Sequence, residues 1–192
     1  LHEAAGSDVV IGGIAYTATE PAKAYRLHWK YGQRAAKPAA IRQINMYQDV
    51  YLSNAFIQKE LLLRFKLRES LKRYGHEDTV FALELKRQNI RVKHIENPAL
   101  HLGLEPATIF LAKTEQAVEN LVKLYQNGEQ VEQLKIVRAY RSLQSYHLES
   151  VFAAVLRKFS SLLKLNLTSS NPSLFIFDVY RLYLFSQKMR QR

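Results

Sequence analysis

Apolar positions recur with two different spacings along this chain. Apolar residues three or four positions apart indicate amphipathic helices, whereas short runs of β-branched residues indicate buried strands. Near the start, such a run predicts one strand that contains the pair Gly12-Gly13, which suits a turn or a close backbone approach. The pattern predicts helices over residues 24–31, 59–64, 78–88, 106–128, 131–146, 149–165 and 173–189, and strands over 8–15, 54–57, 90–95 and 99–102, the segment 54–57 being either a strand or a connector.

The order of these elements predicts an α/β fold for the first two thirds of the chain and helices for the rest. The chain has 192 residues, 47% of them hydrophobic, which is enough for a sizeable core. It has no cysteine, which excludes disulfides and thiolate metal sites and fits a reducing compartment. No run approaches the roughly 18 apolar residues that a membrane-spanning helix needs.

Charge is distributed unevenly along the chain, whose formal net charge is +11. Residues 23–73 hold 12 Lys or Arg and 3 Asp or Glu, and residues 129–192 hold 10 and 4. These two basic blocks, of +9 and +6, flank an acidic centre, residues 74–128, of −1. Basic surfaces attract phosphates of nucleotide sugars, lipid headgroups or nucleic acids. The plain alternative is a solvated basic surface without any partner.

The most informative segment runs from Tyr74 to Phe81, where a glycine and a histidine precede two adjacent acids, Glu77 and Asp78. The following residues have helical spacing, so both acids are expected in the first turn of a helix, and Asn89 is a plausible C-cap. Peptide N–H groups at that end stabilise negative charge and would keep a carboxylate ionised at neutral pH. Such a carboxylate beside a Gly-containing loop suits a general base. The alternative is an acidic turn that only complements the helix dipole.

Several motifs in a fixed order resemble the acceptor-side half of family 2 glycosyltransferases of a bacterial surface-polysaccharide type. The first has the form YG-x-ED-x-x-F and is followed by H-I-x-N-P-x-x-H-x-G, which spans residues 94–103. A Gly-Gly turn after a strand, an S-N-x-F segment beginning at Ser53 and the helix at residues 110–121 complete the series. The resemblance covers roughly residues 8–125.

This resemblance implies the acceptor-side half of a Rossmann-like glycosyltransferase A-type fold with a helical C-terminal extension. Residues 1–128 would form the acceptor-side portion of the transferase domain, and residues 129–192 would form the extension. The implied activity is inverting transfer of a sugar from a nucleotide-sugar donor to a glycan or lipid-linked acceptor. The implied cofactor is Mg²⁺ or Mn²⁺, which stabilises the charge of the leaving diphosphate.

By the same resemblance, Asp78 would be the general base and Glu77 would bind the acceptor. His101 is a candidate metal ligand, since neutral imidazole suits Mn²⁺; it is equally consistent with a histidine that ends a short strand. His94 is in phase with the apolar positions of its strand, so a core histidine is expected there.

Five further residues are candidates for substrate binding, each with a structural alternative. Gly12 and Gly13 would pass close to the donor sugar or simply form a turn. Arg42 would grip phosphate with its bidentate guanidinium, or be a solvated charge. Asn54 would present its amide to a sugar hydroxyl, or be a turn residue. His76 would contact the acceptor, or be a solvated loop histidine.

One expected motif has no counterpart. The donor half of the family carries an Asp-x-Asp pair that holds the metal and the nucleotide. The four aspartates here are widely separated. We therefore expect this chain alone to be inactive and the complete protein, with a donor-binding half, to be the enzyme.

The C-terminal helices mix aromatic and basic residues, a composition that can place a helix on an anionic membrane surface. The alternative is a helix packed on the catalytic domain. A peripheral location on the inner face of the membrane would bring a cytoplasmic enzyme close to a lipid-linked acceptor. The competing function is a non-catalytic basic module that docks on anionic membrane or nucleic acid. No nucleic-acid motif is present, so we expect no nucleic-acid partner.

Overall fold

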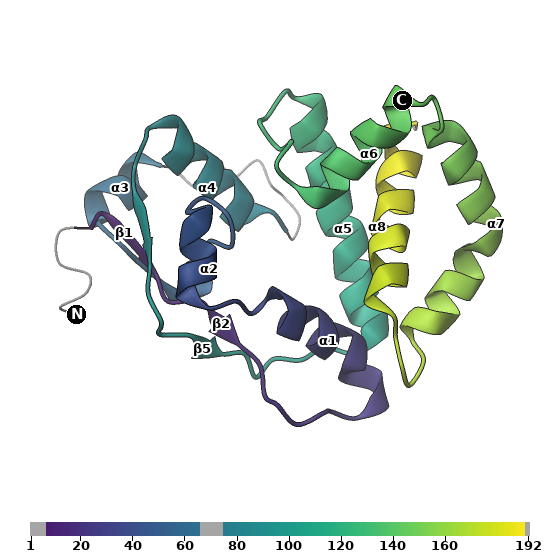
Figure 1. Ribbon diagram of the computed structural model, residues 1–192, viewed down its shortest axis with the longest axis horizontal. Coiled ribbons are helices and arrows are strands. Elements are labelled where there is room, and N and C mark those ends of the chain that lie inside the picture. The colour runs from purple at the N-terminus through teal and green to yellow at the C-terminus, as the bar shows by residue number, and fades with distance from the viewer. Residues whose placement is uncertain (1–6, 66–74, 191–192) are drawn as a thin grey trace. The chain divides into compact units, whose positions relative to one another are not determined.

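The computed structural model describes residues 7–65 and 75–190, which form two compact units (Figure 1). The first unit contains the described parts of residues 1–20, 31–72 and 76–104, and the second contains those of 21–30, 73–75 and 105–192. The first unit is mixed α/β and the second is helical, so the predicted α/β class is confirmed at that level. Residues 105–128, which include helix α5, belong to the second unit. The predicted division of function between residues 1–128 and 129–192 stays a prediction.

The first unit is built around a small mixed sheet. Strand β1 lies at its centre, in the order β3-β1-β4, antiparallel to β3 and parallel to β4. A separate parallel pair joins β2 to β5. The unit's elements are β1 (Val9–Ile11), β2 (Ile14–Ala15), α2 (Ala39–Ile44), the 3-10 turn η3 (Leu52–Asn54), β3 (Ala55–Ile57), α3 (Lys59–Arg64), α4 (Glu77–Arg87), β4 (Val92–His94) and β5 (Ala99–Leu100).

The single strand predicted over residues 8–15 is wrong in one respect, because it is two strands separated by Gly12-Gly13. Gly13 has a φ of 89°, which interrupts the extended backbone and turns the chain toward a different partner strand. All three residues of β1 are buried, as expected for an apolar strand with neighbours on both sides.

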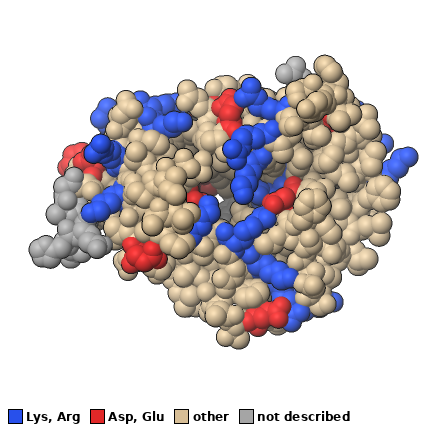
Figure 2. All heavy atoms as spheres, viewed as in Figure 1, with Lys and Arg blue, Asp and Glu red and all other residues tan. Residues whose placement is uncertain are grey.

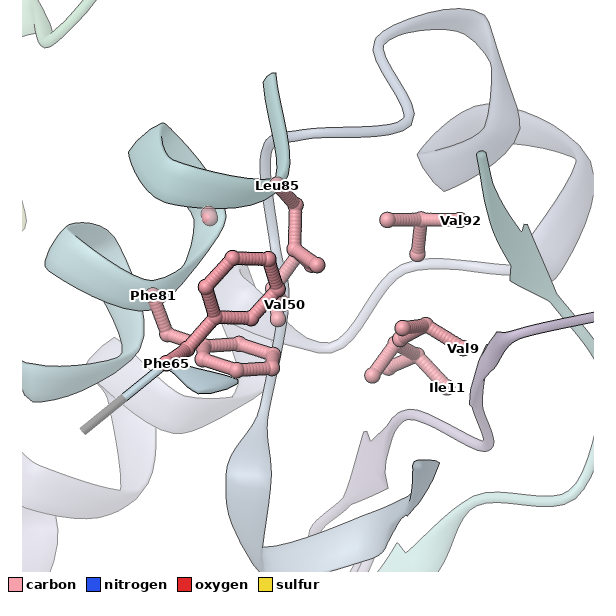
Figure 3. Packing of buried hydrophobic residues seen from close by; sticks show 8 residues of the cluster. Val9, Ile11, Val50, Phe65, Phe81, Leu85 and Val92 are labelled. Atoms are coloured by element: carbon pink, nitrogen blue, oxygen red, sulfur yellow. The ribbon is translucent and has the colours of Figure 1, made fainter. Parts of the chain in front are cut away.

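The core of the first unit lies between the sheet and α4. In Figure 3, Val9, Ile11 and Val92 of the sheet lie across from the aromatic rings of Phe65 and Phe81. The two rings meet edge to face with their centroids 6.1 Å apart. These contacts explain the apolar spacing of α4, since its inward positions are the ones that reach the sheet.

The second unit is a layer of helices centred on α8, which packs against α5, α6 and α7. Figure 1 shows α8 between α5 and α7. Rings from three helices, Tyr125, Tyr140 and Phe185, meet with centroids 5.0–6.2 Å apart. The helices of this layer are α5 (Ala107–Gln126), α6 (Lys135–Ser145), α7 (Glu149–Leu167) and α8 (Leu174–Met189). The 3-10 turn η2 (Lys23–Tyr25) precedes helix α1 (Arg26–Ala35). Residues 26–30 of α1 are counted with the second unit and residues 31–35 with the first.

Some helix ends lie where the sequence predicts them and others do not. The predicted C-cap region of α4 is confirmed, with Asn89 in the left-handed conformation at a φ of 53°. The N–H of Asn89 donates to the Lys86 carbonyl and that of Ile90 to the Leu85 carbonyl, which satisfies two carbonyls of the last turn. Helix α6 begins at Lys135, four residues later than predicted, because the residues after Val131 form a turn.

The charges of the second unit are partly paired. Lys164 lies 3.1 Å from Glu115 and Lys188 lies 3.6 Å from Glu119, so acids on α5 hold cations of α7 and α8. Figure 2 shows Lys and Arg side chains interspersed with other residues over the visible face. Within residues 7–65 and 75–190, no helix is long and apolar enough to cross a membrane.

Candidate functional site

The two adjacent acids lie in the first turn of α4, as the sequence predicts. The preceding residue, His76, has a φ of 75°, and its Nδ1 lies 3.1 Å from the hydroxyl of Thr79. This left-handed residue turns the chain sharply into the helix. The side chain of Glu77 is exposed, whereas that of Asp78 is half-buried, so the two carboxylates have different surroundings. Tyr74 of the same motif lies outside the described residues.

The carboxylate of Asp78 is held by the backbone of η3. Its Oδ1 accepts a hydrogen bond from the N–H of Leu52 at 3.2 Å. Burial raises the pKa of the Asp78 carboxyl above its ordinary value of 3.8; the hydrogen bond from Leu52 opposes this shift and the charge of Glu77 adds to it. The sequence predicted that the helix end would favour the ionised form. Burial acts in the opposite direction, and a base with a raised pKa binds a proton more readily.

The η3 turn connects this carboxylate to the pair Gly12-Gly13. Asn54, the last residue of the turn, donates from Nδ2 to the carbonyls of Gly13 and Asn97, at 2.8 Å each. In return, the N–H of Gly12 donates to the Asn54 carbonyl at 2.9 Å. Both N–H groups of the Asn54 amide therefore join the η3 turn to the segments that follow β1 and β4.

Both glycines are needed because the space beside them is filled. A Cβ on Gly12 would lie 2.4 Å from Nδ2 of Asn54 and 2.5 Å from the carbonyl oxygen of Asn97. A Cβ on Gly13 would lie 2.7 Å from Nη2 of Arg42, at a backbone conformation that residues other than glycine rarely adopt. The glycines thus allow an amide and a guanidinium to approach the backbone closely.

Arg42 is almost fully buried, with 1% of its surface exposed. Nε donates to the Lys37 carbonyl at 3.1 Å. Nη1 reaches the Ile11 carbonyl at 3.3 Å and Nδ1 of His94 at 2.7 Å, and Nη2 reaches the carbonyls of Gly12 and Ile95 at 3.2 and 2.8 Å. These five acceptors match the five N–H donors of a guanidinium. The arrangement therefore makes Arg42 a structural clamp and leaves no donor for a phosphate.

His94 is a core histidine, as predicted. Arginine can only donate, so Nδ1 of His94 is the acceptor, and its Nε2 donates to the Met46 carbonyl at 3.0 Å. The ring is therefore neutral with its proton on Nε2. Burial lowers the pKa of the imidazole, the bond to Met46 opposes this, and the charge of Arg42 lowers it further.

His101 follows the last residue of β5. Its N–H donates to the Ala15 carbonyl at 2.8 Å, and its ring meets that of Tyr16 with centroids 5.1 Å apart. Tyr16 in turn lies over Gly32, where an added Cβ would be 2.2 Å from the ring. In the part of the chain that the structure describes, no three His, Cys, Asp or Glu side chains come together as a metal site. A metal role for His101 stays a prediction.

Four of the predicted substrate-binding residues meet in one hydrogen-bonded cluster, which consists of Gly12, Gly13, Arg42 and Asn54. We call it the Gly-Gly cluster. The Leu52–Asn54 turn joins it to Asp78. The sequence missed two contributors: the N–H of Leu52, which is a backbone group without a side-chain signal, and the Asn97 carbonyl. Asn97 was visible as part of the motif over residues 94–103, but the role of its carbonyl as an acceptor was not.

A comparison of the chain with protein-family models, with curated proteins and with solved structures finds no match. The arguments for function therefore come from the motifs and from the geometry of the first unit.

Proposed function

We propose that this chain forms the acceptor-side part of an inverting glycosyltransferase. The complete enzyme transfers a sugar from a nucleotide-sugar donor to a glycan or lipid-linked acceptor. The ordered motifs between residues 9 and 121 support this proposal, and so does the mixed sheet with its covering helix. The finer fold we propose for the first unit is the acceptor-side half of a Rossmann-like glycosyltransferase A-type domain.

The observation that carries the proposal is the setting of Asp78. One oxygen is fixed by the Leu52 N–H, and burial raises the pKa, so the carboxylate is both oriented and suited to take up a proton. A hydrogen bond that holds a base in place preserves its geometry toward a substrate. A carboxylate that only complemented the helix dipole would be expected to stay at the solvated surface, as Glu77 does.

In the proposed reaction, Asp78 accepts the proton of an acceptor hydroxyl. The hydroxyl oxygen forms a bond to the anomeric carbon of the donor sugar from the face opposite the diphosphate. The bond between that carbon and the diphosphate oxygen breaks, and its electron pair leaves with the nucleoside diphosphate. Exposed Glu77, adjacent in the same helical turn, binds a second acceptor hydroxyl and orients the first.

In this proposal the Gly-Gly cluster has a supporting role. Arg42 and Asn54 fix the backbone on either side of the Gly pair, and the same Leu52–Asn54 turn positions Asp78. Residues that lock the position of a catalytic group improve its precision without touching the substrate. Arg42 is therefore assigned to the framework and not to phosphate binding.

The implied metal does not fit the described residues by themselves. His101 lies against Tyr16, and no group of three metal-ligating side chains forms within residues 7–65 and 75–190. A Mg²⁺ or Mn²⁺ ion would depend on ligands from the donor half, and no step above is assigned to it.

The test uses the complete protein that contains this chain. It is incubated with radiolabelled UDP-glucose, UDP-galactose or GDP-mannose and with the glycolipid fraction of its host cells, and label in that fraction is counted. Asp78→Asn is expected to reduce transfer by roughly 10²-fold or more, as loss of a general base does, with unchanged binding of UDP or GDP. Glu84→Gln, on the same helix but outside its first turn, is the matched control and should retain transfer.

Near-normal transfer by Asp78→Asn would remove this residue from the role of base. Absence of transfer by the unaltered protein with every donor would favour the second candidate, a basic binding module without catalysis. The net charge of +11 and the exposed apolar face described next favour that candidate.

A further inference from the structure

Helix α7 is apolar on two sides, but only one side is covered. Ala153 and Leu167 are buried within the second unit. Six other apolar residues, from the residue before the helix to its last turn, are exposed by 47% to 68%. We call these residues the α7 stripe: Leu148, Val151, Val155, Phe159, Leu162 and Leu165.

The spacing of the α7 stripe places its residues on one helix face. Successive members are three or four positions apart, which matches 3.6 residues per turn. Single exposed apolar residues are common in proteins, whereas a continuous row along an entire helix marks an interaction surface. Figure 1 shows α7 at the edge of the helical layer, with α8 between it and α5. The exposed row is therefore not the side on which α7 packs against α8.

The charges around the α7 stripe favour an anionic partner. Arg157 and Lys158 are exposed, and neither forms an ion pair among the described residues. Lys164, in contrast, is paired with Glu115 of α5. From residue 150 to 177 the sequence contains three basic residues and no acidic one. Lys158 is three positions from Val155 and four from Leu162, so it shares the face of the α7 stripe, whereas Arg157 is two positions from Val155 and from Phe159 and lies on the other side of the helix. An apolar row that carries an unpaired cation, in a segment without acids, is the composition of a helix that lies at an anionic lipid–water interface.

A second copy of the chain fits this surface poorly. Residue 158 is the midpoint of the range Glu149–Leu167, so an antiparallel two-fold pairing of α7 would bring the two Lys158 side chains together. No acid of the stripe would offset the repulsion between them. A lipid surface presents phosphates at this place instead.

We propose that the α7 stripe docks the protein on an anionic lipid bilayer, with α7 lying parallel to the membrane surface. The apolar side chains enter the boundary between headgroups and acyl chains, while the long side chain of Lys158 extends to the lipid phosphates. This inference rests on the second unit alone and holds whether or not the first unit takes part in sugar transfer.

The test is co-sedimentation of the full chain with vesicles of phosphatidylcholine alone or with roughly 30% phosphatidylglycerol. Each binding measurement is made at low and at near-physiological salt concentration. Binding to the anionic vesicles is expected, with much weaker binding to neutral ones. Phe159→Ser combined with Leu162→Ser should weaken binding by roughly tenfold or more, because each apolar side chain that enters the bilayer contributes to affinity. Lys158→Gln should selectively weaken binding to the anionic vesicles, whereas Arg157→Gln, on the other side of the helix, should weaken it less.

Ile109→Ser is the matched control, since Ile109 lies on α5 of the same unit and is 48% exposed, as is Phe159. It should bind vesicles like the unaltered chain. Circular dichroism of every variant establishes that the helices remain folded. Failure of the unaltered chain to bind anionic vesicles, or equal binding by the Phe159/Leu162 variant, would overturn the proposal. A dimer in sedimentation velocity that depends on Phe159 and Leu162, without vesicle binding, would also overturn it and assign the surface to a second copy.

Discussion

The guanidinium of Arg42 donates a hydrogen bond to Nδ1 of His94 across 2.7 Å in the interior of the first unit. The two residues come from α2 and β4, 52 positions apart in the sequence. Because the guanidinium has no acceptor, this bond requires a neutral imidazole with an unprotonated Nδ1. A buried cation is thus held by a neutral ring and four backbone carbonyls, without a carboxylate among these acceptors.

Substitution of Arg42 by lysine is expected to destabilise the first unit by about 3 kcal/mol. A lysine ammonium has three donors at one point, so carbonyls now held by the planar guanidinium would lose their partners in a buried position. Urea denaturation measures the loss, and faster exchange of the Ile95 amide, which bonds to the Ile11 carbonyl, locates it in this unit. Arg91→Lys at an exposed position is the control; an equally small effect of both substitutions would contradict the clamp.

The stability of the chain should fall as the pH drops below about 6.5, in part because of His94. Its pKa in the folded state lies below the ordinary value of 6.5, so the unfolded state binds a proton first as the pH falls. The stabilisation is therefore complete above pH 6.5 and is lost as the pH falls toward the folded-state pKa. Arg42 and Asp49 are the charged groups that influence the ring, in opposite directions.

The substitution His94→Gln tests this pH dependence, since a glutamine can accept from Arg42 and donate to Met46 without titrating. The decrease in urea midpoint between pH 7.5 and 5 (roughly the range over which histidine titrates) should be smaller in this variant. His147→Asn, at an exposed left-handed position that asparagine tolerates, should leave the decrease unchanged. An unaltered decrease in His94→Gln would assign the acid sensitivity to other groups.

Asp78→Asn is expected to stabilise the fold at neutral pH while it strongly reduces the proposed transfer. A folded-state pKa above 3.8 means that this group favours folding below pH 3.8 and that the contribution is lost as pH rises through the folded-state value. The amide carries no charge to desolvate, and its oxygen still accepts from Leu52. We expect a gain of about 0.5 to 1 kcal/mol in thermal or urea unfolding, a pattern common for functional residues.

The matched control for this prediction is Glu77→Gln, which changes the adjacent but exposed carboxylate and should alter stability by less than about 0.5 kcal/mol. A clear loss of stability in Asp78→Asn would show that the ionised carboxylate holds η3 in place. Asp78 would then be a structural cap and not a group kept for chemistry.

Gly32→Ala is expected to destabilise the chain, against the preference of helices for alanine. Helix propensity alone would favour alanine by about 1 kcal/mol. The added Cβ, however, would lie 2.2 Å from the Tyr16 ring, and displacing a packed ring costs roughly 1–3 kcal/mol. The double variant Gly32→Ala/Tyr16→Leu should lose less than the sum of the single variants. Gly103→Ala, whose Cβ would meet nothing closer than 3.8 Å, is the control; equal effects would contradict the contact.

Local sequence determined most of the secondary structure. Helix α3 occupies the predicted residues 59–64, and α5 begins directly after Pro106, whose lack of an N–H costs nothing at a helix start. Asn89 lies where α4 ends, because an asparagine accepts the left-handed conformation more readily than most residues. These features depend on neighbours within about four positions, and the sequence contains all of that information.

Only the tertiary structure decided what the charged and apolar side chains do. The sequence placed Arg42 in a basic block, but burial of its guanidinium depends on carbonyls from Gly12 and Ile95, which are close in space and distant in the chain. Asp78 was visible as a carboxylate in a first helical turn, whereas its raised pKa comes from its burial in the folded unit. Likewise, the periodicity of α7 indicated apolar faces but not which one is covered. Spacing along a chain sets which side chains share a face, and burial depends on what folds against that face.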